Sequence, residues 1–229
     1  LKKIIFKFNK YLSIYTDKII YNSYSGKEFY ENSGYSKKNS IVINNGFDKE
    51  HYFLNQDLRN SFRNKYYLGK KDFVIGMLAR YDPQKNYNLV IDIIKKILDY
   101  KDGKKIKFIL AGPNIDKDNY NLVKNLKNYL NSNVFLIGEV VNTNQFYNGV
   151  DVTILPSGYG EGFPNVIGES MLCGTPCIVS NSGESHEIVG NNGWLIKNND
   201  VDDLVEKICN SYFSKYETKK WQDLSTNCI

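Results

Sequence analysis

Most of the chain alternates between short apolar runs and amphipathic segments. From residue 73 onward, six apolar runs are each followed by a segment with helical periodicity. We expect strands at residues 73–78, 106–112, 134–138, 152–156, 177–180 and 194–196, and helices at about 87–100, 118–131, 143–148, 165–172, 185–189 and 201–213. Apolar strands that alternate with helices are typical of a parallel sheet covered on both faces. The pattern predicts a Rossmann-like, doubly wound α/β fold, in which ligands bind beyond the carboxyl ends of the strands.

The first 46 residues carry a smaller version of this pattern. Residues 1–15 place apolar side chains at helical spacing, and strands are expected at 18–22 and 40–43, on either side of a short helix at 26–32. We interpret residues 1–46 as the last units of an N-terminal α/β domain whose beginning is absent. Residues 47–70 are expected to be a polar connection with a helix near 58–66, and residues 71–229 a C-terminal domain.

The uneven distribution of charge along the chain bears on whether it binds nucleic acid or lipid. Residues 1–70 carry 13 basic and 6 acidic side chains, whereas residues 71–229 carry 17 and 19. The lysines of the first part are dispersed among Asn, Ser and Tyr without a nucleic-acid-binding motif, so we expect no nucleic acid partner. We interpret this basic part as a surface near anionic lipid headgroups or as an aid to solubility. Residues 1–15 are expected to form either an amphipathic membrane-surface helix or a surface helix packed on its own domain. No apolar run approaches the roughly 18 residues of a transmembrane helix.

The cysteines and histidines do not form a recognisable metal or catalytic pattern. The four cysteines show no CxxC spacing, and a zinc site is not expected with only two histidines. We interpret the thiols as reduced structural groups of a cytoplasmic protein, and His51 and His186 as surface or helix-capping side chains. The cysteines are Cys173, Cys177, Cys209 and Cys228.

Two cations follow the first strand of the larger domain. Arg80 and Lys85 lie five residues apart in the segment ARYDPQKN, with Pro83 fixing the bend between them and a helix opening just after. A planar guanidinium and a point-charge ammonium could hold a diphosphate from two sides. Surface charges at a strand end are the alternative interpretation.

Two glutamates follow the fourth strand. Glu161 lies in a glycine-rich loop and Glu169 one turn into the next predicted helix, within the segment PSGYGEGFPNVIGE. The backbone N–H groups between them offer an anion site at a helix start, and Glu169 could accept hydrogen bonds from a ribose diol. One alternative is that the two glutamates are the catalytic carboxylate pair of a glycosidase. The other is that they are solvated surface carboxylates without a catalytic role.

These segments together resemble the retaining, two-Rossmann-domain (GT-B) glycosyltransferases of family 4, also called glycosyl transferases group 1. PSGYGEGFPNVIGE is similar to the E-x7-E signature of that family, and ARYDPQKN is similar to its Arg/Lys diphosphate motif. NNGFD, FILAGP and FLIGEV match weaker landmarks in the same order. The resemblance extends from Asp17 to Phe213.

The resemblance implies roles for individual residues. Arg80 and Lys85 would bind the donor diphosphate and stabilise the leaving nucleoside diphosphate, and Glu161 would contact hydroxyls of the donor sugar. Glu169 would hold the ribose. The implied contacts to sugar, phosphate and base, largely through the backbone, are Gly138, Glu139, Val140, Gly162, Phe163, Pro164, Asn165 and Val166. No metal and no further cofactor are expected, because the Arg/Lys pair takes the place of a divalent ion.

The resemblance also implies an activity. We expect a hexosyl-type glycosyltransferase that moves a sugar from a UDP-, GDP- or ADP-sugar to a glycan or lipid-linked acceptor with retention of configuration. Bacterial surface polysaccharide synthesis at the inner face of the membrane is the expected setting. The chain is expected to be the donor-binding part, truncated at its C-terminus, which without the missing N-terminal domain binds the donor but does not transfer it. The alternatives are a GT-B-fold nucleotide-sugar epimerase or phosphorylase and a non-catalytic nucleotide or carbohydrate binding module.

Overall fold

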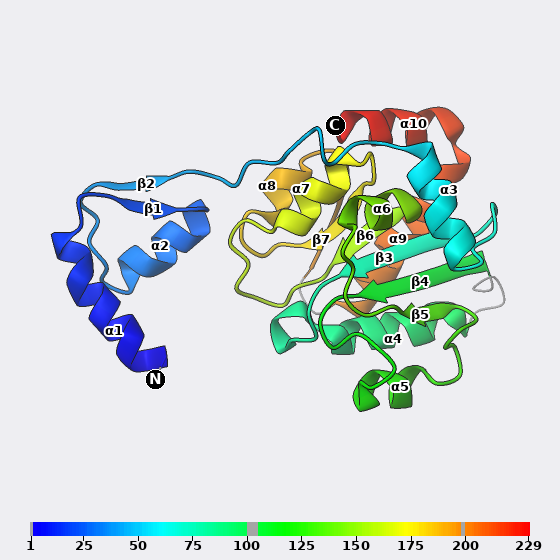
Figure 1. Ribbon diagram of the computed structural model, residues 1–229, viewed down its shortest axis with the longest axis horizontal. Coiled ribbons are helices and arrows are strands. Elements are labelled where there is room, and N and C mark those ends of the chain that lie inside the picture. The colour runs from blue at the N-terminus through cyan, green and yellow to red at the C-terminus, as the bar shows by residue number, and fades with distance from the viewer. Residues whose placement is uncertain (1, 100–104, 198–199) are drawn as a thin grey trace.

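The computed structural model describes residues 2–99, 105–197 and 200–229, which form a smaller and a larger body (Figure 1). The smaller body contains α1 (Lys2–Leu12), the 3-10 helix η1 (Ser13–Tyr15), β1 (Ile19–Tyr21), α2 (Tyr24–Asn32) and β2 (Ser40–Val42). The larger body contains α3 (Gln56–Lys65), β3 (Phe73–Leu78), the 3-10 helix η2 (Pro83–Lys85), α4 (Tyr87–Leu98), β4 (Ile106–Ala111), α5 (Tyr120–Leu126), β5 (Val134–Leu136), α6 (Thr143–Gly149), β6 (Val152–Leu155), α7 (Asn165–Leu172), β7 (Cys177–Ser180), α8 (Ser185–Val189), β8 (Gly193–Ile196), α9 (Val201–Tyr216) and α10 (Thr218–Asn227).

The larger body is built on one parallel sheet with the strand order β5-β4-β3-β6-β7-β8. The chain therefore builds outward from β3 to β5 and then crosses back to place β6 on the other side of β3. These two strands are direct neighbours, with Ile75 opposite Val152 and Gly76 opposite Thr153. In open α/β sheets such a reversal of strand order leaves a crevice beyond the strand ends, where ligands bind. The predicted doubly wound fold is confirmed.

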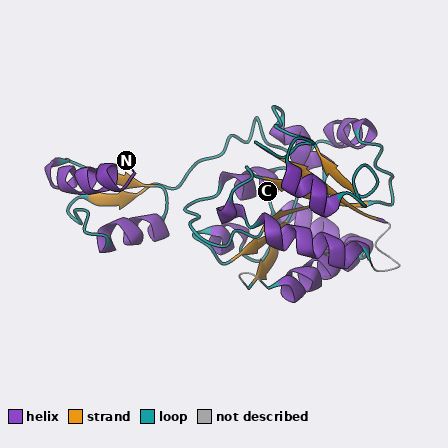
Figure 2. Cartoon of the chain, turned by 90° about the horizontal axis from the view of Figure 1, so that it is seen from below, coloured by secondary structure: helices purple, strands orange, loops and turns teal. Residues whose placement is uncertain are grey.

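Helices cover both faces of this sheet (Figure 2), because its strands are apolar on both sides. In β3, Phe73, Ile75 and Met77 join one buried cluster with α4, α5 and α9. Val74 points to the opposite face and joins a second cluster that contains side chains of α3 and α6. A third cluster joins β6 and β7 to α7 and α8. Each fully buried aliphatic side chain stabilises the fold by about 1.5–3 kcal/mol.

The predicted strands and helices all appear, with differences at some ends. The helix expected at 118–131 was wrong in length: α5 ends at Leu126, and the carbonyl of Tyr129 then accepts the amides of Ser132, Asn133 and Val134 in a tight turn. The helix expected at 87–100 ends at Leu98, and its last expected residue lies outside the described residues. The pattern did not predict α10, which packs beside α9.

A buried ionic cluster joins three elements at the amino ends of the strands. The Asp151 carboxylate, just before β6, contacts Arg59 at 2.5 Å, Arg63 at 3.4 Å and Lys215 at 2.9 Å, and it accepts the Val74 amide at 2.7 Å. Burial raises the pKa of Asp151, but the three cations outweigh this effect and hold it below its ordinary value. Both arginines also donate to carbonyls at the carboxyl end of α6, where the helix dipole favours positive charge. The segment that carries α3 is therefore an integral part of the larger body.

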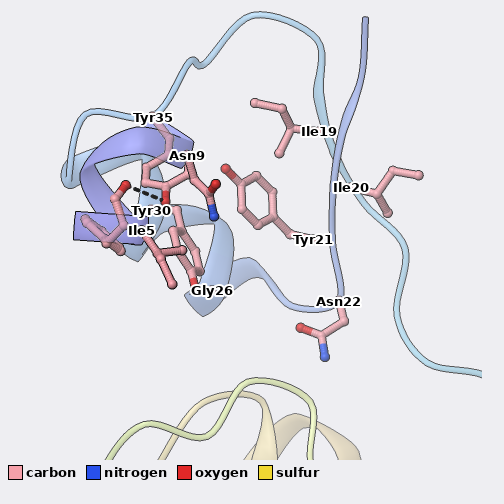
Figure 3. A pocket seen from close by; sticks show the side chains of 10 residues that line it. Ile5, Asn9, Ile19, Ile20, Tyr21, Asn22, Gly26, Tyr30 and Tyr35 are labelled. Atoms are coloured by element: carbon pink, nitrogen blue, oxygen red, sulfur yellow. Dashed lines mark hydrogen bonds between the residues drawn. The ribbon is translucent and has the colours of Figure 1, made fainter. Parts of the chain in front are cut away.

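The smaller body has a parallel strand pair, β1 and β2, with α1 and α2 on the same side of it (Figure 1). Tyr21 points toward the helices and is 8% exposed, whereas Ile20 points to the other face and is 61% exposed. Beside the pair lies a cavity of about 630 Å³, lined by Ile5, Ile20, Tyr21 and Tyr30 among others (Figure 3). Two strands with one helical layer leave apolar surface open. None of the described helices is long and apolar enough to cross a membrane.

Candidate active site

The candidate site lies where β3 and β6 end side by side. Asp82 caps η2 by accepting the Gln84 amide at 2.9 Å, and Asn86 then takes a left-handed conformation that starts α4. This sharp bend turns Gln84 and Lys85 toward the loop that follows β6. The strand order thus brings residues 80–85 to residues 157–161, although about 76 positions separate them.

Lys85 and Glu161 form the central ion pair of the site. The Lys85 ammonium lies 2.5 Å from the Oε1 atom of Glu161, and the Ser157 hydroxyl donates to the same oxygen at 2.5 Å. The side chains of Lys85 and Glu161 are only 13% and 7% exposed. Oε2 of Glu161 takes part in neither contact and could accept a further hydrogen bond. The sequence suggested both residues but not their pairing.

Arg80 is held at the rim of the site by two neighbours on its own loop. Its Nε atom donates to Asp82 at 3.3 Å, and its guanidinium donates to the Gln84 side chain at 3.1 Å. The hydrogen bond from the Gln84 backbone amide, together with Arg80, lowers the pKa of Asp82 below its ordinary value. With 57% of its side chain exposed, Arg80 can contact a ligand in the crevice.

The backbone at Glu161 and Gly162 is held between two further segments. The Glu184 amide donates to the Gly162 carbonyl at 2.9 Å, and the Ser182 hydroxyl lies 3.4 Å from the Glu161 amide. Gly183 has a positive φ of 59°, and a Cβ there would lie 2.2 Å from the Glu161 carbonyl oxygen. Only glycine therefore permits this close approach.

The smaller body and the segment that joins it to the larger body contact the loop after β7 and the start of α7. The Glu184 side chain is buried and accepts the Ser25 amide at 2.9 Å, at the start of α2. At the joining segment, the Asn45 amide donates to the Asn165 side chain at 2.6 Å, and the rings of Phe47 and Phe163 stack at 6.0 Å. Residues 1–46 thus border the candidate site.

Glu169 lies one turn into α7, half-buried. The hydroxyl of the buried Tyr147 donates to its Oε2 atom at 2.9 Å. Burial, reinforced by the negative charge of Glu169, raises the pKa of Tyr147 well above its ordinary value, so the phenol keeps its proton and remains a donor. The start of α7, at Phe163, Pro164, Asn165 and Val166, lies between the two glutamates in the chain, as expected from the sequence.

The segment predicted to contact the base lies farther along the same sheet edge. Gly138, Glu139 and Val140 follow β5, which is two strands away from β3. The Gly138 amide donates to the Ile115 carbonyl at 2.8 Å, which fixes the turn. Glu139 and Val140 line a cavity of about 310 Å³ together with Phe62 of α3. Among the described residues, no hydrogen bond or ion pair joins this segment to Arg80, Lys85 or Glu161.

The histidines and cysteines lie where the sequence indicated. His51 and His186 are both exposed, and His186 is at the start of the short helix α8. Three of the four free thiols are buried, at Cys173, Cys177 and Cys228. Over the described ranges, no group of three or more His, Cys, Asp or Glu side chains is arranged to hold a metal ion.

Sequence reasoning missed four residues of the site. Ser157 lies four positions before Glu161, and Gln84 directly precedes Lys85, so both were within the recognised segments but carried no distinct signal. Ser182 and Tyr147 come from other strand and helix ends, and only the fold brings them to Glu161 and Glu169.

Comparison with known proteins identifies the family. A family model described as Glycosyl transferases group 1 matches residues 59–222. The chain belongs to this glycosyltransferase family. It is 32% identical over 196 residues to the UDP-Gal:alpha-D-GlcNAc-diphosphoundecaprenol alpha-1,3-galactosyltransferase of Escherichia coli, which covers 82% of this chain and 48% of the relative. It is 28% identical to the poly(ribitol-phosphate) alpha-N-acetylglucosaminyltransferase of Staphylococcus aureus, over 73% of this chain and 34% of the relative.

Solved structures of GT-B glycosyltransferases share the fold. The structure of Anabaena Alr3699/HepE in complex with UDP-glucose matches with a TM-score of 0.85 and 20% identity, over 100% of this chain and 62% of that chain. The structure of TarM matches with a TM-score of 0.76 and 17% identity, over 99% of this chain and 41% of that chain. The chain spans about half the length of the first curated relatives that it matches.

Proposed function

We propose that this chain is the donor-binding part of a hexosyltransferase that uses a nucleoside diphosphate sugar, with UDP as the preferred nucleotide. The observation that carries the proposal is the Lys85–Glu161 pair beside Arg80 at the β3/β6 switch point. Cations at this point can bind a diphosphate, and a nearby carboxylate oxygen can accept sugar hydroxyls. The family membership supports the choice of ligand, as do the similar galactosyltransferase of Escherichia coli, which uses UDP-Gal, and the similar Anabaena structure in complex with UDP-glucose.

In the proposed reaction the bond between the sugar and the diphosphate breaks, and the oxygen of an acceptor hydroxyl forms the new bond to the sugar. The hydroxyl proton passes to the leaving diphosphate or to water, while negative charge develops on the leaving nucleotide. Arg80, Lys85 and the backbone amides at the start of α7 would stabilise that charge, since preorganised donors act strongly where charge develops. Glu161, with Oε1 held by Lys85 and Ser157, would keep Oε2 toward the sugar. Glu169, oriented by Tyr147, would hold the ribose. Retention of configuration and independence from a metal ion belong to the same proposal.

The acceptor is proposed to be a glycan or a lipid-linked sugar at the cytoplasmic face of the membrane. The similar galactosyltransferase of Escherichia coli, whose acceptor is a diphosphoundecaprenol-linked sugar, supports this choice. Residues 1–46 are proposed to pack against further β/α units of an acceptor-side domain, because the β1/β2 pair leaves Ile20 and a cavity uncovered (Figure 3). The outer side of α1, with exposed Ile4 and Phe8 beside lysines, suits a peripheral contact with anionic lipid.

The proposed donor site is tested by titration calorimetry with UDP, GDP and ADP. We expect UDP to bind, and the double variant Arg80→Ala/Lys85→Ala to bind at least tenfold more weakly, since each charged hydrogen bond is worth about 1.5–3 kcal/mol. Lys127→Ala, on the exposed surface after α5, is the matched control. UDP binding by the double variant that is as tight as that of the unaltered chain would contradict the proposed site.

Two further measurements separate this function from its alternatives. Conversion of a UDP-sugar to its epimer without any acceptor would point to an epimerase. UDP-sugar binding that is unaffected by Glu161→Ala would favour a binding module without transferase chemistry.

A further inference from the structure

We infer that Gln84 is a positioning residue of the donor site, which aligns the Arg80 guanidinium with the loop that carries Glu161; this inference rests on the proposed function. Gln84 is half-buried between Arg80 and the loop of residues 157–161. Its side-chain amide bonds to Arg80 and to Gly160, and its backbone carbonyl bonds to Gly158.

Both ends of the Gln84 amide are used. The Oε1 atom accepts from the Arg80 guanidinium at 3.1 Å, and the Nε2 group donates to the Gly160 carbonyl at 2.8 Å. A single planar group therefore fixes the distance between a cation on the β3 loop and a carbonyl on the β6 loop. Asp82, the other partner of Arg80, reaches only within the β3 loop and cannot do this.

The backbone of Gln84 holds the same loop a second time. Its carbonyl accepts the Gly158 amide at 2.9 Å, two residues before the side-chain contact at Gly160. The next residue, Lys85, holds Glu161. Gln84 and Lys85 thus bind three points of the five-residue loop 157–161, at Gly158, Gly160 and Glu161.

Gln84 connects the residues proposed to bind the diphosphate of the donor with the loop proposed to bind its sugar. Arg80 is proposed to contact the diphosphate, and the loop ending at Glu161 the sugar. Gln84 sets the relation between them before a ligand arrives. Alanine cannot form either side-chain bond, and asparagine, one methylene shorter, can reach Arg80 or Gly160 but not both.

A double-mutant cycle on UDP affinity tests this role in the 229-residue chain. Gln84→Met keeps the length of the side chain and removes both hydrogen bonds. We expect it to weaken UDP binding about threefold to tenfold in the unaltered background, as the loss of one or two hydrogen bonds implies. In the Arg80→Ala background the same change should have an effect below about 1.5-fold, because Gln84 acts on the diphosphate through Arg80.

Hydrogen exchange of residues 157–162 without ligand gives a second measurement. We expect faster exchange in Gln84→Met and in Gln84→Asn, and no change in the control Gln56→Met, which loses a surface bond to Asn60 on α3. A variant that melts more than a few degrees below the unaltered chain is replaced in the cycle by Gln84→Asn.

The outcomes distinguish the two proposals. Equal weakening by Gln84→Met in both backgrounds, or unchanged exchange of the loop while the unaltered chain binds UDP, would overturn the role of Gln84 alone. No UDP binding by the unaltered chain would overturn the proposed donor site, and with it any role of Gln84 toward a donor.

Discussion

The ammonium of Lys85 and the carboxylate of Glu161 lie 2.5 Å apart, although they follow two different strands. Their pairing is a consequence of the strand order, since β3 and β6 are neighbours and both loops leave the same edge of the sheet. Each charge is largely removed from water, so each depends on the other for compensation. A site that is proposed to bind an anion therefore already contains a carboxylate bonded to one of its cations.

This dependence predicts that removing one charge of the pair destabilises the protein more than removing both. Lys85→Met leaves Glu161 buried with only the Ser157 hydroxyl, and we expect a loss of about 3 kcal/mol in the free energy of unfolding. The double variant Lys85→Met/Glu161→Gln removes both charges and should recover part of this loss. Urea unfolding of the three proteins measures it. A double variant that is less stable than Lys85→Met would contradict the pairing.

The Asp151 cluster predicts a stability that depends on pH. The folded pKa of Asp151 lies below its unfolded value of about 3.9, so its contribution is fully present above roughly pH 5 and is lost as the pH falls through the lower, folded value. Asp151→Asn should lose about 3–5 kcal/mol at pH 7, because three cations lose their carboxylate. The difference between the two proteins should shrink as the pH approaches 3 in urea unfolding.

A matched control for this effect is Asp118→Asn, at an exposed position before α5. If Asp151→Asn does not fold, Lys215→Met tests the same cluster with a smaller change. A stability difference between Asp151→Asn and the unaltered chain that stays constant from pH 7 to pH 3 would speak against the cluster as described.

The contact between Glu184 and Ser25 predicts local protection at the start of α2. The buried carboxylate accepts the Ser25 amide and lies at the positive end of the helix dipole. Glu184→Ala should accelerate hydrogen exchange of the Ser25 amide about tenfold, which corresponds to one lost charge-assisted hydrogen bond. Glu206→Ala, on the exposed side of α9, should leave this amide unchanged. Identical exchange of Ser25 in both variants would mean that the two bodies do not meet at this point in solution.

The thiols are expected to differ in reactivity. Burial raises the pKa of Cys173 and of Cys228 to about 12, and it also raises that of Cys177. At pH 8 only about one in ten thousand of the Cys173 and Cys228 groups is then a thiolate, the reactive form. A disulfide reagent should modify the half-buried Cys209 first, and Cys209→Ser should remove that phase. Fast labelling of Cys209→Ser under native conditions would show that one of the buried thiols is accessible.

Much of the fold follows from local pattern, and some of it does not. The apolar runs predicted every strand of the larger body, and Asn165–Leu172 and Cys177–Ser180 were predicted to the residue. The length of α5 was wrong because the helical periodicity of residues 118–131 continues past Leu126, whereas the backbone turns there to meet β5. Helix α10 was missed because its segment TKKWQDLSTN contains only two large apolar side chains, Trp221 and Leu224, too few to stand out as a helical pattern.

The sequence by itself determined the fold class, the family and the chemical identity of Arg80, Lys85, Glu161 and Glu169 as candidate ligand-binding residues. These conclusions rest on local order along the chain, namely apolar runs, a helix start and fixed spacings. Tertiary structure alone decided that Lys85 pairs with Glu161 and that Asp151 forms ion pairs with three basic side chains. It also decided that Gln84 bonds to Gly160 and Tyr147 to Glu169. Such contacts join residues tens of positions apart, and no periodicity records which loops a reversal of strand order will bring together.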